Sequence, residues 1–101
     1  FIVRNIGNFV APFDPDNNYH ATASAIEYAV SILEVSDVIV CGHSHCGAIE
    51  ALYKNIKETP ENTHTIKWLE LGHKAKKVAT LAYKNEDKIK MLRYTEQISV
   101  V

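Results

Sequence analysis

The residues with the clearest chemical potential lie in segment 41–47, which reads Cys-Gly-His-Ser-His-Cys-Gly. Imidazole nitrogen and thiolate sulfur are the ligands that a tetrahedral zinc ion prefers. His43 and Cys46 are three residues apart, so a tight turn can direct both side chains at one ion. A second interpretation stays open, in which His43 is a turn residue and Cys46 a small buried thiol. Two ligands by themselves do not complete a zinc site.

The segments before this turn predict the elements that position it. Residues 1–5 and 38–41 are short apolar runs, which are typical of buried strands. Between them, residues 20–33 repeat apolar side chains with the period of a helix. A strand, a helix and a strand with short connections predict a parallel pair with a right-handed crossover. We therefore expect an α/β fold, with a parallel β-sheet core and flanking helices, and the turn at the carboxyl end of the second strand.

Further helices are expected after the turn. Apolar spacing predicts helices over residues 47–56 and 65–83, separated by breaking residues around Pro60, and residues 86–101 form a last helical pattern. A length of 101 residues corresponds to one domain at most. Because both ends interrupt predicted elements, we expect residues 1–101 to be part of a longer catalytic domain.

Composition excludes several classes of function. The formal net charge is −1, and no basic excess is present that would neutralise phosphates, so we expect no nucleic-acid partner. No apolar run approaches the roughly 20 residues that cross a bilayer, so no membrane association is expected. The two cysteines, Cys41 and Cys46, are too close together for a disulfide framework. Free thiols favour a reducing compartment, and we expect a cytoplasmic protein.

Three separate motifs resemble those of the β-class carbonic anhydrases. Residues 1–8, FIVRNIGN, are similar to the family's strand-and-loop motif FVVRNxxN. Residues 25–30, AIEYAV, resemble its helix motif, and residues 38–47, VIVCGHSHCG, resemble its GHxxCG zinc turn. The motifs follow in the family's order at close to its spacing, and they cover the first half of the chain. The resemblance implies a zinc enzyme that interconverts carbon dioxide and bicarbonate.

The resemblance also implies roles for individual residues. His43 and Cys46 correspond to two of the family's three protein ligands for zinc. The remaining ligand is the Cys of a CxDxR motif that this sequence does not contain, and neither Cys41 nor His45 matches it. The Asp and Arg of that motif, which orient or replace the zinc-bound water, are missing with it. We therefore assign no catalytic residue within the chain, and we expect residues 1–101 alone to be inactive and unstable.

The family's carbon dioxide pocket is apolar. Phe1, Ile6 and Gly47 match residues that line it, and Tyr28 matches a tyrosine that reaches it from the partner subunit of a dimer. The resemblance thus implies a homodimer or a larger homo-oligomer. From residue type alone, Phe1, Ile6 and Tyr28 are also typical of an ordinary core, and Gly47 of a glycine at the start of a helix.

Other candidates and rival functions are weighed beside these. Cys41 is expected to be structural, in the core of a sheet that is covered on both sides. The remaining histidines are expected at the surface, namely His20, His45, His64 and His73. One rival function is a non-catalytic α/β module that binds an anion or small ligand at residues 42–47. Another is a thiol redox protein that uses Cys41 and Cys46, whose separation lacks the C-x-x-C geometry that lowers a thiol pKa.

Overall fold

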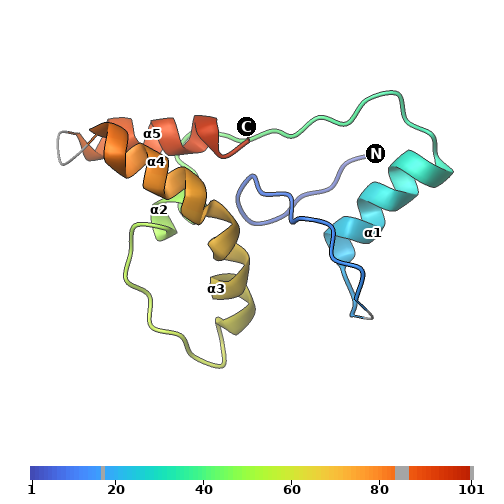
Figure 1. Cartoon of the computed structure of the whole chain (residues 1–101), viewed down its shortest axis with the longest axis horizontal. Coiled ribbons are helices and arrows are strands. Elements are labelled where there is room, and N and C mark those ends of the chain that lie inside the picture. Colours follow the sequence, from blue (N-terminus) through green and yellow to red (C-terminus); the bar gives the residue numbers. More distant parts are fainter. Residues whose placement is uncertain (17, 84–86, 101) are drawn as a thin grey trace.

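The computed structural model describes residues 1–16, 18–83 and 87–100. Within these ranges the regular elements are all helical (Figure 1). In chain order they are α1 (Ala21–Glu27), the π-helical turn η1 (Tyr28–Ile32), α2 (Gly47–Ala51), α3 (Thr63–Leu69), the 3-10 turn η2 (Glu70–Gly72), α4 (His73–Tyr83) and α5 (Lys88–Ile98).

The predicted helices are confirmed, although their bounds differ. The helix predicted over residues 20–33 is α1 followed by η1, and the one predicted over 65–83 is divided into α3, η2 and α4. The helix predicted over 47–56 is shorter, because α2 ends at Ala51. The last helix is α5, and the outermost predicted positions, Glu86 and Val101, lie outside the described residues.

The predicted parallel sheet is wrong for the part of the chain that the structure describes. Neither residues 1–5 nor residues 38–41 form a strand there, and no backbone hydrogen bond joins the two segments. The two segments border one cavity instead, and their apolar side chains are exposed, Ile2 by 84% and Ile39 by 80%. The physical reason is that a helix satisfies its backbone groups internally, whereas a strand depends on a second segment beside it. The α/β class and the strand-helix-strand unit are therefore replaced by a helical architecture.

A side-chain cap begins α5. The Asp87 carboxylate accepts hydrogen bonds from the backbone N–H groups of Ile89 (2.9 Å) and Lys90 (3.2 Å). Both N–H groups belong to the first turn, where a helix offers no internal acceptor. Beyond this start, α5 lies beside α4 (Figure 1), and the rings of Tyr83 and Tyr94 meet edge to face with centroids 5.4 Å apart. The cap fixes the start of α5, and the contact between the two tyrosine rings joins α5 to α4.

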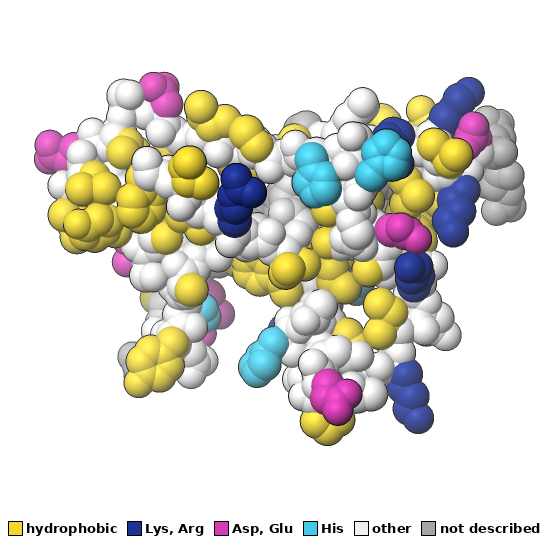
Figure 2. Space-filling model, turned by 180° about the vertical axis from the view of Figure 1, so that it is seen from behind, with side chains coloured by type: hydrophobic (Ala, Val, Ile, Leu, Met, Phe, Trp, Pro, Cys, Tyr) yellow, Lys and Arg dark blue, Asp and Glu magenta, His cyan; other side chains and the backbone are white. Residues whose placement is uncertain are grey.

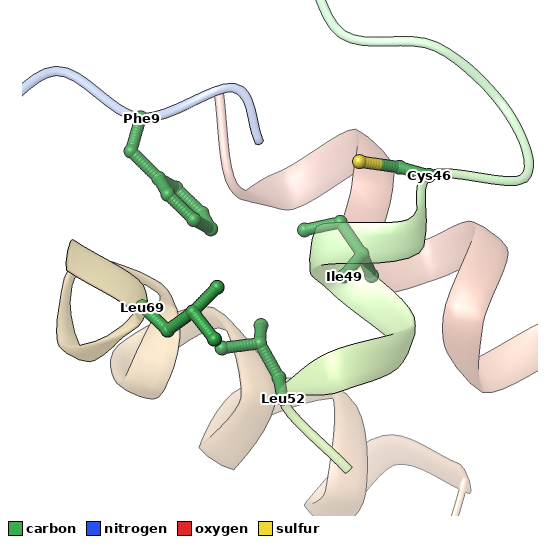
Figure 3. Close-up of a cluster of buried hydrophobic side chains, with 5 residues drawn as sticks. All are labelled: Phe9, Cys46, Ile49, Leu52 and Leu69. Atoms are coloured by element: carbon green, nitrogen blue, oxygen red, sulfur yellow. The ribbon is translucent and has the colours of Figure 1, made fainter. Parts of the chain in front are cut away.

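The core lies where α2 meets α3 and the loop before residue 10. Phe9, Ile49, Leu52 and Leu69 point toward one another there, and Cys46 lies at the edge of the cluster (Figure 3). Gly72 permits this close approach, because a Cβ atom at this position would come within 2.8 Å of Leu52 and Phe9 side-chain atoms. The core therefore packs directly against the first residues of α2.

The region around α1 is much more open. Apolar side chains spread over that part of the surface (Figure 2), and the large exposed ones in the first 40 residues are Phe1, Ile2, Val3, Ile6, Val10, Phe13, Tyr19, Tyr28, Val30, Ile32, Leu33, Val35, Val38, Ile39 and Val40. Ala29 is the buried apolar residue of α1 and η1. As for membrane crossing, none of the helices described here combines the length and apolar character that a bilayer span requires.

Candidate functional site

The turn before α2 is sharp. His45 adopts a left-handed backbone conformation with φ of 58°, which is uncommon for a residue other than glycine. Cys46 follows in an extended conformation, with φ of −73° and ψ of 118°, and occupies the N-cap position of α2. Gly47 is the first residue of the helix, so its interpretation as a glycine at a helix start is confirmed. The chain thus changes direction between residues 44 and 47.

Gly42 precedes this turn and lies against the N-terminal loop. A Cβ atom at Gly42 would come within 2.5 Å of the Asn8 side-chain nitrogen, so only glycine fits without displacement of Asn8. Asn8 is itself buried, with an exposed fraction of 6%. The contact places the turn next to a loop more than thirty residues earlier in the sequence.

Cys46 is held from two sides. Its side chain is buried among the core residues and carries a free thiol (Figure 3). Its backbone N–H donates a hydrogen bond of 3.0 Å to a carboxylate oxygen of Glu96 in α5. The interpretation of Cys46 as a buried thiol is therefore confirmed.

His43 is exposed and oriented by its neighbour. Its Nδ1 lies 2.7 Å from the carbonyl oxygen of Ser44. A carbonyl only accepts hydrogen bonds, so this contact assigns the ring hydrogen to Nδ1 and leaves the Nε2 lone pair free. Metal-bound histidines commonly donate their second ring N–H in this way. In a neutral His43 this hydrogen bond leaves Nε2 available to a metal ion.

The donors in this turn fit part of a zinc site. An imidazole and a thiol suit zinc chemically. Across residues 1–16, 18–83 and 87–100, however, no three His, Cys, Asp or Glu side chains are grouped so that they could hold an ion. His43 and Cys46 therefore provide two donors, and a zinc site built on them needs a further protein ligand.

The predicted pocket residues are only partly brought together. A cavity of about 660 Å³ is bordered by the N-terminal segment, α1 and residues 35–43. Phe1 and His43 border it, whereas Ile6, Tyr28 and Gly47 do not. The rings of Phe1 and Tyr28 lie 5.9 Å apart. Their exposed fractions are 69% and 45%, and that of Ile6 is 56%, so none of the three is an ordinary core residue here.

The remaining candidates lie at the surface. The expected exposure of the other histidines is confirmed for His20, His45, His64 and His73. Cys41 is also exposed, so its expected place within a covered sheet is wrong. The sheet that would have contained it is absent from the described ranges, and Cys41 is exposed instead.

Sequence reasoning did not find Glu96. Its side chain is buried, with an exposed fraction of 7%, and it accepts hydrogen bonds from the Cys46 amide and from the Arg93 guanidinium. Its backbone carbonyl accepts a hydrogen bond of 3.0 Å from the Asn8 side chain. A usable signal was its helical register, because Glu96 is four residues after the apolar Leu92, on the face of α5 that packs inward.

The charge of Glu96 is stabilised by its surroundings. Burial by itself raises the pKa of the Glu96 carboxyl. The hydrogen bonds from Arg93 and from the Cys46 amide, together with the positive charge of Arg93, outweigh burial and hold that pKa below its ordinary value. Glu96 is therefore a carboxylate at neutral pH, and it can accept both hydrogen bonds.

Comparison with known proteins supplies the family context. Residues 1–101 match a family model described as carbonic anhydrase. A carbonic anhydrase from Synechococcus elongatus is 32% identical over 95 residues, which cover 91% of this chain and 34% of the relative. "Beta carbonic anhydrase 5, chloroplastic" from Arabidopsis thaliana is 40% identical over 76 residues, which cover 75% of this chain and 25% of the relative. The chain thus spans about a third or less of the length of these relatives.

Proposed function

This chain belongs to the β-class carbonic anhydrase family, and from that premise we propose that the protein containing it catalyses the zinc-dependent, reversible hydration of carbon dioxide to bicarbonate. The single observation that carries the proposal is the turn before α2. It presents His43 with a free Nε2 lone pair, three residues before the buried thiol of Cys46. Both donor types are those that zinc prefers.

The residues of the chain have distinct parts in this proposal. His43 and Cys46 hold zinc through Nε2 and Sγ. When bound, zinc supplies Lewis-acid activation of water at neutral pH. Ser44 accepts the Nδ1 hydrogen of His43 and so preserves the metal-binding tautomer. Burial of Cys46 keeps bulk water from one side of the thiol.

Carbon dioxide is apolar and suits an apolar cavity. Phe1 and His43 both border the cavity, which supports a place for the substrate within it. We propose Ile6, Tyr28 and Gly47 as further substrate contacts on the strength of the family resemblance. In this chain these three lie off the border of the cavity, so their contact with substrate requires other parts of the protein.

We further propose that another protein ligand for zinc comes from a part of the longer protein outside residues 1–101. The described residues supply no group of three ligands, which supports this view. A polypeptide of residues 1–101 alone is then inactive, because a two-ligand site binds zinc weakly and leaves it poorly oriented. Carbon dioxide hydration by the isolated 101-residue polypeptide would contradict this part of the proposal.

We propose a homodimer or larger homo-oligomer in the cytoplasm as the working state. The exposed apolar surface around α1, which includes Tyr28, supports the oligomer, because a second subunit would cover it. The cytoplasmic location is supported by the free thiols of Cys41 and Cys46, which are typical of a reducing compartment. Light scattering of the longer protein measures its mass directly, and a monomer at micromolar concentration would contradict the oligomer.

The decisive experiment measures zinc content and carbon dioxide hydration in the longer protein. We expect about one zinc ion per chain in the unmodified protein, and loss of both zinc and activity in His43→Ala and Cys46→Ser. The matched control is His45→Asn on the same turn, because asparagine tolerates the left-handed backbone there. This control keeps its zinc and its activity.

Two outcomes separate the rival functions. A longer protein that is folded but has a measured zinc content near zero favours a non-catalytic module that binds a small ligand or anion at residues 42–47. Full activity in His43→Ala, with activity lost in Cys46→Ser, favours thiol chemistry instead. Either result contradicts carbon dioxide hydration at this turn.

A further inference from the structure

Glu96 contacts the candidate metal turn from the opposite end of the chain. Its Oε1 accepts the backbone N–H of Cys46, fifty residues earlier, at 3.0 Å. Cys46 is the N-cap residue of α2 and makes no side-chain cap. In residues 1–16, 18–83 and 87–100, this is the side-chain hydrogen bond that links the turn at 41–47 to another part of the chain.

The position of Glu96 is itself fixed. Arg93, one turn earlier on α5, donates to the same Oε1 atom, and its side chain is 29% exposed against 7% for Glu96. Two donors that converge on one oxygen select one rotamer of the glutamate. The carboxylate is therefore a rigid acceptor rather than a mobile surface charge.

The backbone of Glu96 is also held by hydrogen bonds. The Asn8 side chain donates a hydrogen bond of 3.0 Å to the Glu96 carbonyl, and the Ser99 hydroxyl donates one of 2.6 Å to Asn8. Asn8 is also the residue against which Gly42 packs. The end of α5, the N-terminal loop and the turn thus form one connected polar network around Cys46.

We propose that Glu96 is a positioning residue for the metal turn. By accepting the Cys46 N–H it fixes the backbone from which the thiol projects, and Arg93 keeps Glu96 in the orientation that this requires. The inference rests on the proposed function, because it takes Cys46 as a zinc ligand. Partners of this kind, which orient a ligand without touching the metal, typically change metal affinity about 10–100-fold when removed.

The test uses the longer protein with Glu96→Ala, Glu96→Gln and Glu96→Asp. In each variant we measure the zinc dissociation constant by competition with a chelator, the thiolate-to-metal absorption of the cobalt form, and the exchange rate of the Cys46 amide in the metal-free protein. For Glu96→Ala we expect faster exchange of that amide, an altered cobalt spectrum and a zinc dissociation constant raised about 10–100-fold. Glu96→Gln retains an acceptor oxygen and stays within about threefold of the unmodified protein.

The matched control is Thr95→Val, at the neighbouring buried position. The Thr95 hydroxyl donates to the Met91 carbonyl and shares a hydrogen bond with the Tyr53 hydroxyl, both at 2.7 Å, and neither hydrogen bond involves the turn. We expect this variant to lower the unfolding midpoint while zinc affinity and the cobalt spectrum stay unchanged. The control separates positioning of Cys46 from general loss of stability.

A folded Glu96→Ala protein with unchanged zinc affinity and cobalt spectrum overturns the inference. If that variant does not fold, the Gln and Asp variants decide, because Asp withdraws the carboxylate by one methylene. The inference requires that a variant with faster exchange of the Cys46 amide also binds zinc more weakly. A change in only one of these two quantities overturns the inference. If the unmodified protein binds no zinc, the proposed function is contradicted instead. The exchange rate of the Cys46 amide is measured without metal, so it still shows in that case whether Glu96 holds the Cys46 backbone.

Discussion

Two regions of this molecule differ in how far their apolar side chains are buried. The packed region consists of Phe9 and helices α2 to α5, and Ile49 within it is 0% exposed. The open region consists of residues 1–6 and 19–42, where Ile39 is 80% exposed. Both regions are rich in apolar residues, so composition does not explain the difference. The open region contains a helix, α1, as well as extended segments, so helix formation does not explain the difference either. In the packed region α5 packs against both α4 and α2, whereas Ala29 is the buried residue of α1 and η1.

The candidate site lies on the boundary between these regions. Cys46 belongs to the packed region, through its burial and through the hydrogen bond to Glu96. His43 belongs to the end of the open region, and its ring is oriented by the adjacent residue alone among the described residues. The comparison therefore indicates that the thiol half of the turn is preorganised by this chain. The imidazole half depends more on what surrounds it.

The largest effect is expected from Ile49→Ala in the longer protein. Because Ile49 is fully buried among Phe9, Leu52 and Leu69, the substitution leaves a cavity, and we expect a loss of about 2–5 kcal/mol in the free energy of unfolding. Urea unfolding followed by tryptophan fluorescence, to which Trp68 beside this core contributes, measures the loss. Ile49→Val is the graded control, with a loss of about 0.5–1.5 kcal/mol. A loss below that of Ile49→Val would break the distinction between the two regions.

A smaller effect is expected at the edge of the packed region, from Asp87→Ala. The substitution removes the cap that accepts the N–H groups of Ile89 and Lys90, and such losses typically cost about 1 kcal/mol. The same urea measurement detects it. Asp87→Asn keeps an acceptor at the cap and should remain close to the unmodified protein. An unchanged free energy of unfolding in Asp87→Ala would show that the cap does not support α5.

The smallest effect is expected in the open region, from Ile39→Ala in the 101-residue chain. Ile39 is 80% exposed in this chain, so its truncation removes few contacts, and we expect a change within about 0.5 kcal/mol in the free energy of unfolding. Amide hydrogen exchange at low temperature measures this change in the free energy of unfolding, because the method also applies to a chain of low stability. A loss above about 1 kcal/mol in this chain would mean that Ile39 is covered, and the two regions would no longer be distinct.

Prediction from the sequence succeeded where the signal was local. Helical periodicity predicted α1, α4 and α5, because the side chains that define a helical face are close in sequence. The polar surroundings of His64 and His73 predicted their exposure correctly. The turn before α2 was likewise recognisable from Gly47 and its neighbours, and the family match agrees with the motifs around it.

Prediction failed where a residue's state depends on distant partners. Residues 1–5 and 38–41 carry strand-like apolar runs, but a run of this kind indicates only that a segment can pair, not that a partner lies beside it. Glu96 was missed for the related reason that its acceptor role is defined by a backbone N–H fifty residues away. Neither pairing is visible in the spacing of neighbouring residues.

The amino-acid sequence by itself determined the helices, the His43 and Cys46 donors and the family to which the chain belongs, because these depend on residue type and short-range spacing. Tertiary structure decided which apolar segments are buried and which polar groups meet. It placed Cys46 in the core, left Ile39 exposed and brought Glu96 to the turn. Burial and hydrogen bonding depend on distances between segments that chain order does not specify, so only the folded arrangement sets them.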